Sequence, residues 1–358
     1  MLVSYRLIPV NRWTWDDMPP NIAIRGVVSA SVSKQAGSGS SLIDSATLSV
    51  SSDISYEFEE GWYRLEATYF GEESRRIPIG TFFMYPVSDT VRGNHKVTSV
   101  NGTSVLTPLT ERKVRSGDYV ARGASASDKI RRLISDAMPN VPVEVFGSFA
   151  LNEYYVFDPG QKYLDIIWGL LNKAGWCLQI TSTGRVKVKP RPDTPTLLLG
   201  RERKSLLKND IGRSYDRSGI PNRLKVIDQY GQEYVVENHQ PGSKTSYEAR
   251  GRWIDMVDTN PQQKDGETTP AYARRQLELA STWAYTYTFD SHWIDDVLPY
   301  DIIRATLPNE GVEGDLRVVG QNISCGAHLN VSWTVGREVK EYTAWRTNQS
   351  TLSSSANS

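Results

Sequence analysis

An acidic cluster late in the chain is the stretch whose residue types and spacing best suit catalysis. Asp290, Asp295 and Asp296 flank Trp293. Paired carboxylates beside an aromatic side chain suit glycoside hydrolysis, in which one carboxyl group donates a proton and the other assists on the opposite side of the sugar. A solvated acidic loop explains the same residues more simply. A carbohydrate-binding or glycoside-cleaving β-protein is therefore kept as an alternative hypothesis.

Two further groups of acidic and amide side chains give weaker indications of a functional site. Glu57, Glu59 and Glu60 indicate a charged loop. Side chains that could bind calcium also occur close together, namely Asp258, Asn260, Asp265 and Glu267. Their spacing does not fit the EF-hand loop, so we predict no metal site.

The histidines and cysteines form no catalytic pattern. The chain has four histidines, His95, His239, His292 and His328. His95 and His328 fall in expected strands, where a histidine is usually exposed or hydrogen-bonded. Cys177 follows Trp176 in another expected strand and is interpreted as structural, facing away from the tryptophan side. Because no phosphate loop, zinc spacing or nucleophile elbow occurs either, we predict no enzyme activity and no catalytic, cofactor-binding or metal-binding residues.

Composition limits the broad class of the protein. The 358 residues include 41 Lys and Arg against 41 Asp and Glu, which gives no sign of a general affinity for nucleic acid or membrane. Two cysteines cannot form a disulfide framework, and the first residues have no signal-peptide architecture, so synthesis in a reducing cytoplasm is expected. The 10 Trp and 18 Tyr suit surfaces that become buried against partners, or a β-fold rich in these residues.

The elements around residues 154–190 form the clearest pattern. Residues 154–157 predict a short strand, and Asp158 a helix N-cap. Residues 161–174 then predict a helix that ends at Gly175, followed by a β-hairpin over residues 176–190. The apolar residues of the helix recur at helical spacing. Its side chains Ile167, Leu170 and Leu171 are expected to pack on Trp176 and Ile180 of the hairpin.

The remaining chain is mostly β. Residues 1–112 predict a β-barrel or sandwich, interrupted by a flexible Gly/Ser-rich loop at 34–41. Residues 113–198 predict a small α+β domain, whose first helix, near 125–138, is capped by Ser125 with Asp128 three residues later. Alternating valines at 141, 143 and 145 predict a strand after it.

The second half repeats the β character with an interruption. Residues 199–240 and 286–346 predict further β-strands, among them N-R-L-K-V at 222–226. Residues 241–285 predict a helical insertion, in which Thr269 caps a helix and Tyr272, Gln276, Leu279 and Trp283 form one row. Residues 347–358 form a Ser-rich tail.

Four segments resemble the baseplate hub proteins of long-tailed bacteriophages. F-D-P-G-Q-K-Y-L-D-I-I-W-G-L-L-N-K-A-G-W-C-L-Q-I-T-S-T-G-R-V-K-V-K-P at 157–190 is similar to the central small domain of that family. R-R-I-P-I-G-T-F at 75–82 is similar to its first barrel. L-P-Y-D-I-I-R-A at 298–305 and G-D-L-R-V-V-G-Q-N-I-S at 314–324 resemble its closing strands.

The resemblance implies both a fold and a function. The fold is mainly β (α+β), with two tail-tube-like antiparallel β-barrels, a small α+β domain and a helical insertion. The second barrel is discontinuous, over 199–240 and 286–346, and begins with the N-R-L-K-V strand at 222–226. The function is that of a structural virion protein: a homotrimer with pseudo-six-fold symmetry at the distal end of the tail, lining the DNA exit channel. Its partners are distal tail or tail-tube proteins and a tip, fibre or spike protein that closes the channel. Sequence-specific nucleic acid binding and membrane insertion are not expected. A hub of a related contractile injection machine stays open.

Overall fold

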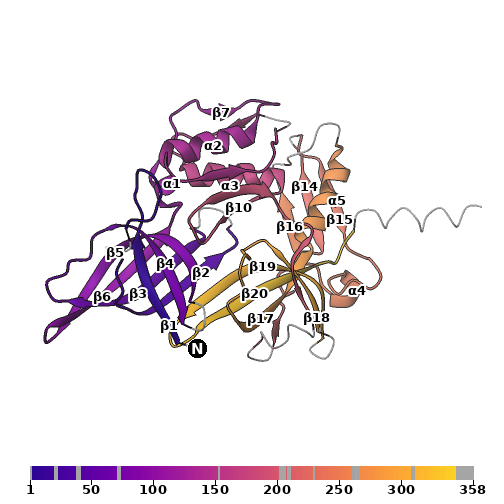
Figure 1. The fold of residues 1–358 in the computed structure, drawn as a ribbon. Helices are drawn as coiled ribbons and strands as arrows, with labels where there is room; N and C mark the ends of the chain where they lie inside the picture. The colour runs from indigo at the N-terminus through magenta and orange to yellow at the C-terminus, as the bar shows by residue number, and fades with distance from the viewer. Residues whose placement is uncertain are drawn as a thin grey trace, which may run out of the picture. The chain divides into compact units, whose positions relative to one another are not determined.

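The computed structural model describes residues 2–19, 23–37, 42–70, 74–151, 154–200, 207, 211–228, 230–259, 261, 267–307 and 311–343. The chain divides into two compact units. Unit 1 comprises Met1–Gly212 with Thr288–Val335, and unit 2 comprises Arg213–Tyr287 with Gly336–Ser358. The chain is mainly β, as predicted (Figure 1). None of the helices in the described ranges is long and apolar enough to cross a membrane.

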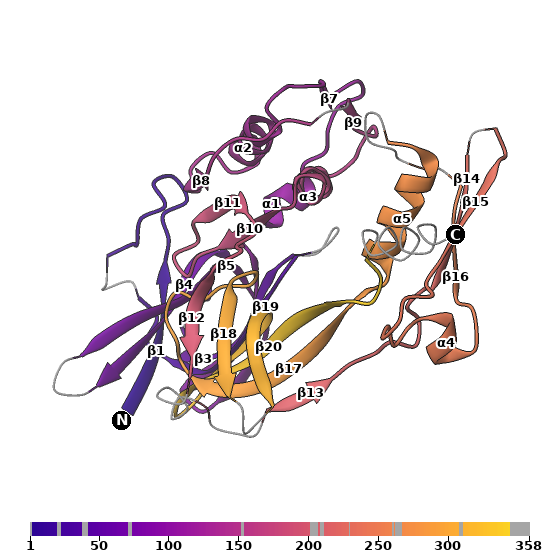
Figure 2. The same ribbon diagram turned by 90° about the vertical axis from the view of Figure 1, so that its right-hand side faces the viewer.

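A twelve-stranded sheet dominates the β-structure, in the order β1-β4-β5-β6-β3-β2-β19-β20-β17-β13, with β18 beside β19 and β12 beside β18 (Figure 2). Its first six strands are β1 (Leu2–Pro9), β2 (Val27–Gln35), β3 (Asp44–Asp53), β4 (Gly61–Phe70), β5 (Arg75–Arg92) and β6 (His95–Ser104). The others are β12 (Pro195–Leu199), β13 (Gly212–Ser214), β17 (Thr282–His292), β18 (Ile302–Leu307), β19 (Val312–Cys325) and β20 (Leu329–Lys340).

The two halves of this sheet join where β2 pairs with β19. Val32 lies opposite Ile323 in that antiparallel pair, and both side chains are buried. The strands expected in two barrels therefore form one continuous sheet, and no closed barrel is traced among the described strands. Period-two alternation explains its core, since β3 buries every second residue along most of its length.

The small α+β region of unit 1 contains three helices and short strands. They are α1 (Thr107–Glu111), β7 (Tyr119–Val120), α2 (Ala126–Ala137), β8 (Val143–Val145), β9 (Tyr155–Val156), α3 (Tyr163–Ala174), β10 (Trp176–Ile180) and β11 (Val186–Pro190). Strands β10 and β11 form the predicted hairpin, and β8 pairs with β11 in parallel. In Figure 2 the hairpin lies between α3 and the strands β12 and β18.

The helix ends show which local predictions were right. The Asp128 backbone N–H donates to the Ser125 hydroxyl at 3.1 Å, which confirms that cap. Gly175 ends α3 in the left-handed conformation with a φ of 69°, also as predicted. The Asp158 cap is wrong, because α3 begins two residues later than expected and its N-cap, Lys162, has no side-chain cap bond.

Unit 2 has a sheet of its own. It contains β14 (Arg223–Ile227), β15 (Glu233–Glu237), α4 (Tyr247–Arg250), β16 (Asp255–Asp258) and α5 (Thr269–Ala280). Strand β14 pairs with β15 and β16. The N-R-L-K-V strand was expected in the second barrel, but it lies in this small sheet and not in the large one. The domain boundaries drawn from the sequence otherwise stay predictions.

Helix α5 covers this small sheet with a face that differs from the predicted row. Tyr272, Ala273 and Leu277 are buried against Leu224 and Val226. Leu279 is 60% exposed and lies outside that face, so the row through Leu279 is wrong. The N-cap is Thr268, whose hydroxyl accepts from the Ala271 N–H, and not Thr269.

Candidate functional site

The β10–β11 hairpin is buried on both faces. Trp176, Leu178 and Ile180 point into the apolar cluster that α2 and α3 line, together with Leu170 and Leu171. Cys177 and Gln179 lie on the opposite face, as strand alternation requires, and are equally buried. A polar side chain in the middle of W-C-L-Q-I is the signal in the sequence that this second face meets another element.

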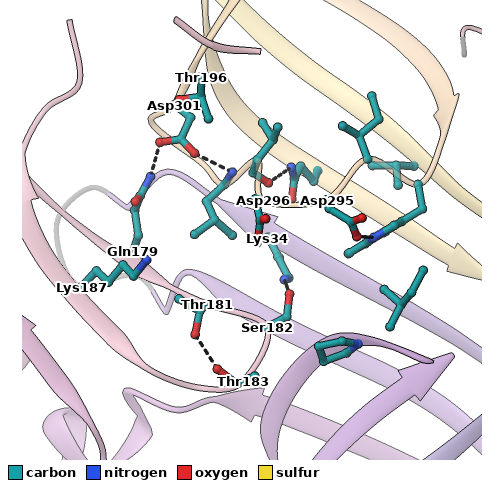
Figure 3. Close-up of a pocket in the computed structure, with 18 of the residues that line it drawn as sticks. Lys34, Gln179, Thr181, Ser182, Thr183, Lys187, Thr196, Asp295, Asp296 and Asp301 are labelled. Atoms are coloured by element: carbon teal, nitrogen blue, oxygen red, sulfur yellow. Dashed lines mark hydrogen bonds between the residues drawn. The ribbon is translucent and has the colours of Figure 1, made fainter. Parts of the chain in front are cut away.

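Gln179 and Asp301 connect the hairpin to the large sheet (Figure 3). The Gln179 amide donates to the Pro299 carbonyl at 2.6 Å and to Asp301 Oδ1 at 2.9 Å. Lys189 Nζ donates to the same Asp301 oxygen at 3.3 Å, and Leu298 N–H donates to Asp301 Oδ2 at 2.9 Å. Asp301 is only 4% exposed, so these three donors, from Gln179, Lys189 and Leu298, are what make its burial tolerable.

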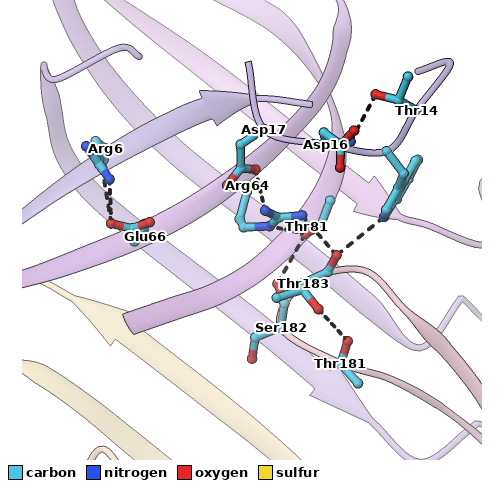
Figure 4. A network of polar contacts seen from close by, with 11 residues as sticks. Arg6, Thr14, Asp16, Asp17, Arg64, Glu66, Thr81, Thr181, Ser182 and Thr183 are labelled. Carbon is cyan, nitrogen blue, oxygen red and sulfur yellow. Dashed lines mark hydrogen bonds and ion pairs between the residues drawn. The ribbon is translucent and has the colours of Figure 1, made fainter. Parts of the chain in front are cut away.

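The tip of the hairpin is held by the strands of the first half of the sheet (Figure 4). Arg64 pairs with Asp17 and donates from Nη2 to the Thr183 carbonyl at 3.1 Å. The Thr81 hydroxyl donates to the Ser182 carbonyl at 3.1 Å. Gly184 has a φ of 79°, and a Cβ there would lie 2.9 Å from the Thr81 Cβ. This turn therefore fits its neighbours so closely that only glycine suits it.

Lys34 lies beneath this tip and is 2% exposed. Its ammonium donates to the Ser182 hydroxyl at 3.4 Å, and Asp44 is its cross-strand partner between β2 and β3. Burial lowers the pKa of Lys34, against the attraction of Asp44, and raises the pKa of Asp44 to about 7, against the attraction of Lys34. The predicted loop at 34–41 is wrong at its start, because β2 continues through Gln35; residues 38–41 lie outside the described residues.

A cleft of about 750 Å³ opens beside Lys34 in unit 1 (Figure 3). Arg75, Arg76 and Lys187 contribute cations to its lining, and Asp295 and Asp296 contribute carboxylates. Its deeper polar groups, Gln179, Asp301 and Gln321 among them, hydrogen-bond to protein atoms. The cleft is therefore the surface of a polar joint between hairpin and sheet.

Comparison with known proteins gives the joint a context. No protein-family model and no curated protein matches the sequence. The 43 kDa tail protein of prophage MuSo2 from Shewanella oneidensis does match in structure, with a TM-score of 0.63 and 11% identity over 94% of this chain and 98% of that one. The chain has the fold of a phage tail protein.

Two other solved structures support the same conclusion about the fold. The tail protein from Neisseria meningitidis MC58 matches with a TM-score of 0.65 and 11% identity over 94% of this chain and 97% of that chain. The Escherichia coli c3393 protein, a component of the type VI secretion system with structural similarity to T4 tail proteins gp27 and gp5, matches with a TM-score of 0.52 and 10% identity, covering 88% and 74%.

Within this tail-protein fold the predicted acidic cluster comes together only in part. Asp295 and Asp296 line the cleft, whereas Asp290 accepts from the Ser332 hydroxyl at 2.6 Å and does not line it. Asp295 is ion-paired through Oδ2 with Arg75, and its Oδ1 accepts from the Trp293 indole at 2.6 Å. Both oxygens of Asp295 are thus engaged by protein donors, which does not favour a role as catalytic acid.

The calcium candidates are also engaged by protein groups where they are described. Asp258 accepts from the Tyr272 hydroxyl at 2.6 Å, and Glu267 forms a bidentate pair with Arg275 at 2.8 Å. Asn260 and Asp265 lie outside the described residues. Over the described ranges, no group of three or more His, Cys, Asp or Glu side chains could hold a metal ion.

The positions and contacts of three histidines and of Cys177 indicate structural roles for these titratable side chains. His239 contacts Glu248 at 2.6 Å and Glu237 at 3.2 Å, and these hydrogen bonds raise its pKa. His95 begins β6 beside Asp53, at 3.9 Å, and His328 lies in a bend before β20 instead of in a strand. Burial raises the pKa of Cys177 to about 11, which keeps its thiol protonated and unreactive.

Proposed function

We propose that the chain is a structural hub at the distal end of a phage tail, where it joins the tail tube to the tip. The observation that carries this proposal is the tail-protein fold, which extends over 94% of the chain and nearly the full length of two tail proteins. Distal tail proteins on one side and a tip, fibre or spike protein on the other are its partners. The location is the virion tail.

The joint in unit 1 suits a part that bears load. The hairpin is fixed on one side by an apolar helical layer and on the other by the hydrogen bonds of Gln179 and Asp301. A third set of contacts, the hydrogen bonds from Arg64 and Thr81, holds its tip. Close-packed protein interiors have low compressibility and transmit strain. This joint would therefore keep the helices and the sheet in a fixed relative geometry when force acts on the tail.

The proposed assembly is a homotrimer around a central DNA exit channel. The large sheet has two halves joined at β2 and β19, and two tube-like halves per chain would let three copies match a six-fold tube. Closed rings are made by head-to-tail contacts that return to the first subunit. Aromatic side chains at the subunit edges would anchor these contacts.

Native mass spectrometry of the assembled chain tests the trimer. Three copies of the 40.2 kDa chain give ~121 kDa for such a closed ring. A stable dimer, or a hexamer in which each chain fills one of six equivalent positions, would contradict the proposal.

A hydrolytic role is tested separately by dye release from labelled host cell wall. Because both Asp295 oxygens are engaged, we expect no turnover above that of buffer. Clear turnover that disappears in Asp295→Asn or Asp296→Asn would overturn the structural proposal and favour the glycoside-cleaving alternative.

A further inference from the structure

Unit 2 contains a shallow pocket of about 380 Å³ that is lined almost wholly by cations. Its lining residues are Arg217, Ser218, Lys244, Arg250 and Arg252, so four of the five carry a positive charge. In the described part of the unit no carboxylate lines it. This composition is unlike that of the unit 1 cleft, which is lined by both cations and carboxylates.

The backbone around the pocket fixes where these charges lie. The Arg250 guanidinium, at the end of α4, donates to the carbonyls of Ile220, at 2.6 Å, and Arg217. Gly251 then turns the chain in the left-handed conformation, with a φ of 62°. The Arg252 carbonyl accepts from the Asn222 amide at 3.0 Å, which holds the next cation at the pocket. Contacts between segments about 30 residues apart therefore hold Arg250 and the Arg252 backbone in place at the pocket.

Three cations of this pocket, Lys244, Arg250 and Arg252, have little compensation from carboxylates. Both hydrogen bonds of Arg250 go to neutral carbonyls, and burial, followed by Arg252 and Arg217, lowers the pKa of Arg250. Glu341 acts in the opposite direction, but it accepts from the Ser243 hydroxyl at 3.1 Å and the Lys244 N–H at 2.6 Å. Across the described residues, no carboxylate lies within 4.0 Å of the Lys244 ammonium or the Arg252 guanidinium.

We propose that this pocket binds phosphate groups, either of free diphosphate or of a nucleic acid backbone. Arginine forks and a lysine ammonium match the oxygens of a phosphate and gain most when no internal carboxylate competes. The volume exceeds what one phosphate group fills, which suits two linked phosphates or a phosphodiester segment. Tyr215, 54% exposed and with Arg217 over its ring at 5.1 Å, adds an aromatic face beside the cations. Binding would be independent of base sequence, and the inference does not depend on the tail role.

The test is a titration of the full chain with three probes: inorganic diphosphate, a short DNA duplex of mixed sequence, and polyglutamate of matched charge. The test variant is Lys244→Glu with Arg252→Glu. The matched control is Arg131→Glu with Arg132→Glu, which makes the same charge change on exposed positions of α2. We expect the test variant to bind both phosphate probes at least about tenfold more weakly, and to lower the salt slope for DNA by about 2. The control should stay within about twofold of the parent chain.

The outcomes separate the sources of phosphate. Diphosphate binding that DNA does not exceed assigns the site to free phosphates, and tighter, salt-dependent DNA binding assigns it to the backbone. The proposal is overturned if neither diphosphate nor DNA binds. It is also overturned if polyglutamate binds as tightly as DNA and the test variant loses both equally. If the charge reversals lower the melting temperature, Lys244→Gln with Arg252→Gln replaces them, since the same loss of phosphate binding is expected without reversed charge.

Discussion

Two hairpins of the molecule have nearly the same local design and very different surroundings. Both β10–β11 in unit 1 and β14–β15 in unit 2 pair five residues with five, and both turns contain a glycine in the left-handed conformation, Gly184 with a φ of 79° and Gly231 with a φ of 80°. All five residues of β10 are buried, whereas β14 buries only alternate residues. The first hairpin is therefore an internal joint, and the second is a surface element covered on one face.

The polar residues of the two hairpins differ for the same reason. Gln179 in β10 is buried and donates to Asp301 and a carbonyl. Arg223 in β14 is bound to Asp255 at a surface ion pair, with Nη2–Oδ2 at 2.8 Å. Removal of a buried partner leaves an unsatisfied group, whereas water replaces a lost surface partner, so substitutions should have larger effects in the first hairpin.

The largest effect is expected in the helix that covers the first hairpin. Leu170→Ala or Leu171→Ala should lower the free energy of unfolding by roughly 2–5 kcal/mol, because both side chains are fully buried. Leu279→Ala, on the exposed side of α5, is the matched control and should stay within about 0.5 kcal/mol of the parent chain. Urea denaturation followed by tryptophan fluorescence measures both. A loss below about 0.5 kcal/mol at both leucines of α3 would show that the packed face is assigned wrongly.

The two turn glycines give a sharper version of the comparison. Gly231→Ala should cost about 1–2 kcal/mol, because alanine disfavours the left-handed conformation and no atom lies within 4 Å of the new Cβ. Gly184→Ala should cost more than this, since its Cβ would also lie 2.9 Å from Thr81 Cβ and 3.0 Å from Trp15. The difference between the two melting temperatures reports the docking of the tip. Equal losses would mean that the tip is not held by the sheet.

A pH series tests the buried pair beneath the tip. Asp44 has a pKa of about 7 in the folded chain and 3.8 as its ordinary value, so the folded state holds a proton that the unfolded state has released between these limits. Stability from Asp44 therefore falls as the pH rises from about 4 to about 7. Asp44→Asn should remove that fall in denaturation measured between about pH 5 and 7.

Asp255 in β16, which pairs with β14 of the second hairpin, supplies the control for this series. The hydrogen bond from Arg223 lowers its pKa, so its contribution is complete above the ordinary value of 3.8 and is lost only as the pH falls through its folded pKa. Asp255→Asn should consequently leave the slope between about pH 5 and 7 unchanged. The proposed burial of Asp44 is refuted if the two variants show the same slope.

The smallest effect is expected at His239 in unit 2. Hydrogen bonds that the His239 ring makes to the Glu248 and Glu237 carboxylates raise its pKa, so its contribution is present below the ordinary value of 6.5 and is lost as the pH rises through the folded pKa. Because the side chain is half exposed, His239→Gln should cost less than about 1 kcal/mol in acid and nothing at about pH 9. A loss that is the same at both pH values would assign His239 a packing role instead.

The sequence predicted the elements that local chemistry decides. The Ser125 cap, the Gly175 helix end and the 176–190 hairpin follow from patterns within a few residues. It could not predict contacts between distant residues, such as Arg64 with Thr183 or Gln179 with Asp301, which depend on how strands associate. Lys34 was misassigned for the same reason, because only the cross-strand Asp44 and the docked tip explain a buried lysine.

Pairing between strands was the least predictable feature of the fold. The residues of β14 have normal strand character, and nothing in them distinguishes membership of the large sheet from pairing with β15 and β16. The cationic pocket of unit 2 was likewise missed, since Arg217, Lys244 and Arg252 are scattered in the sequence and meet only through the turn at Gly251. The R-G-R run at 250–252 was the one local signal that could have suggested it.

The location of the chain in assembled particles tests the central proposal most directly. A tagged chain is expressed in the host that produces the particles, and gold-conjugated antibody against the tag is imaged by electron microscopy. The structural role predicts label at the distal end of the tail, at the junction of tube and tip, in every intact particle. Label along the whole tube, at the head, or absent from purified particles would contradict it.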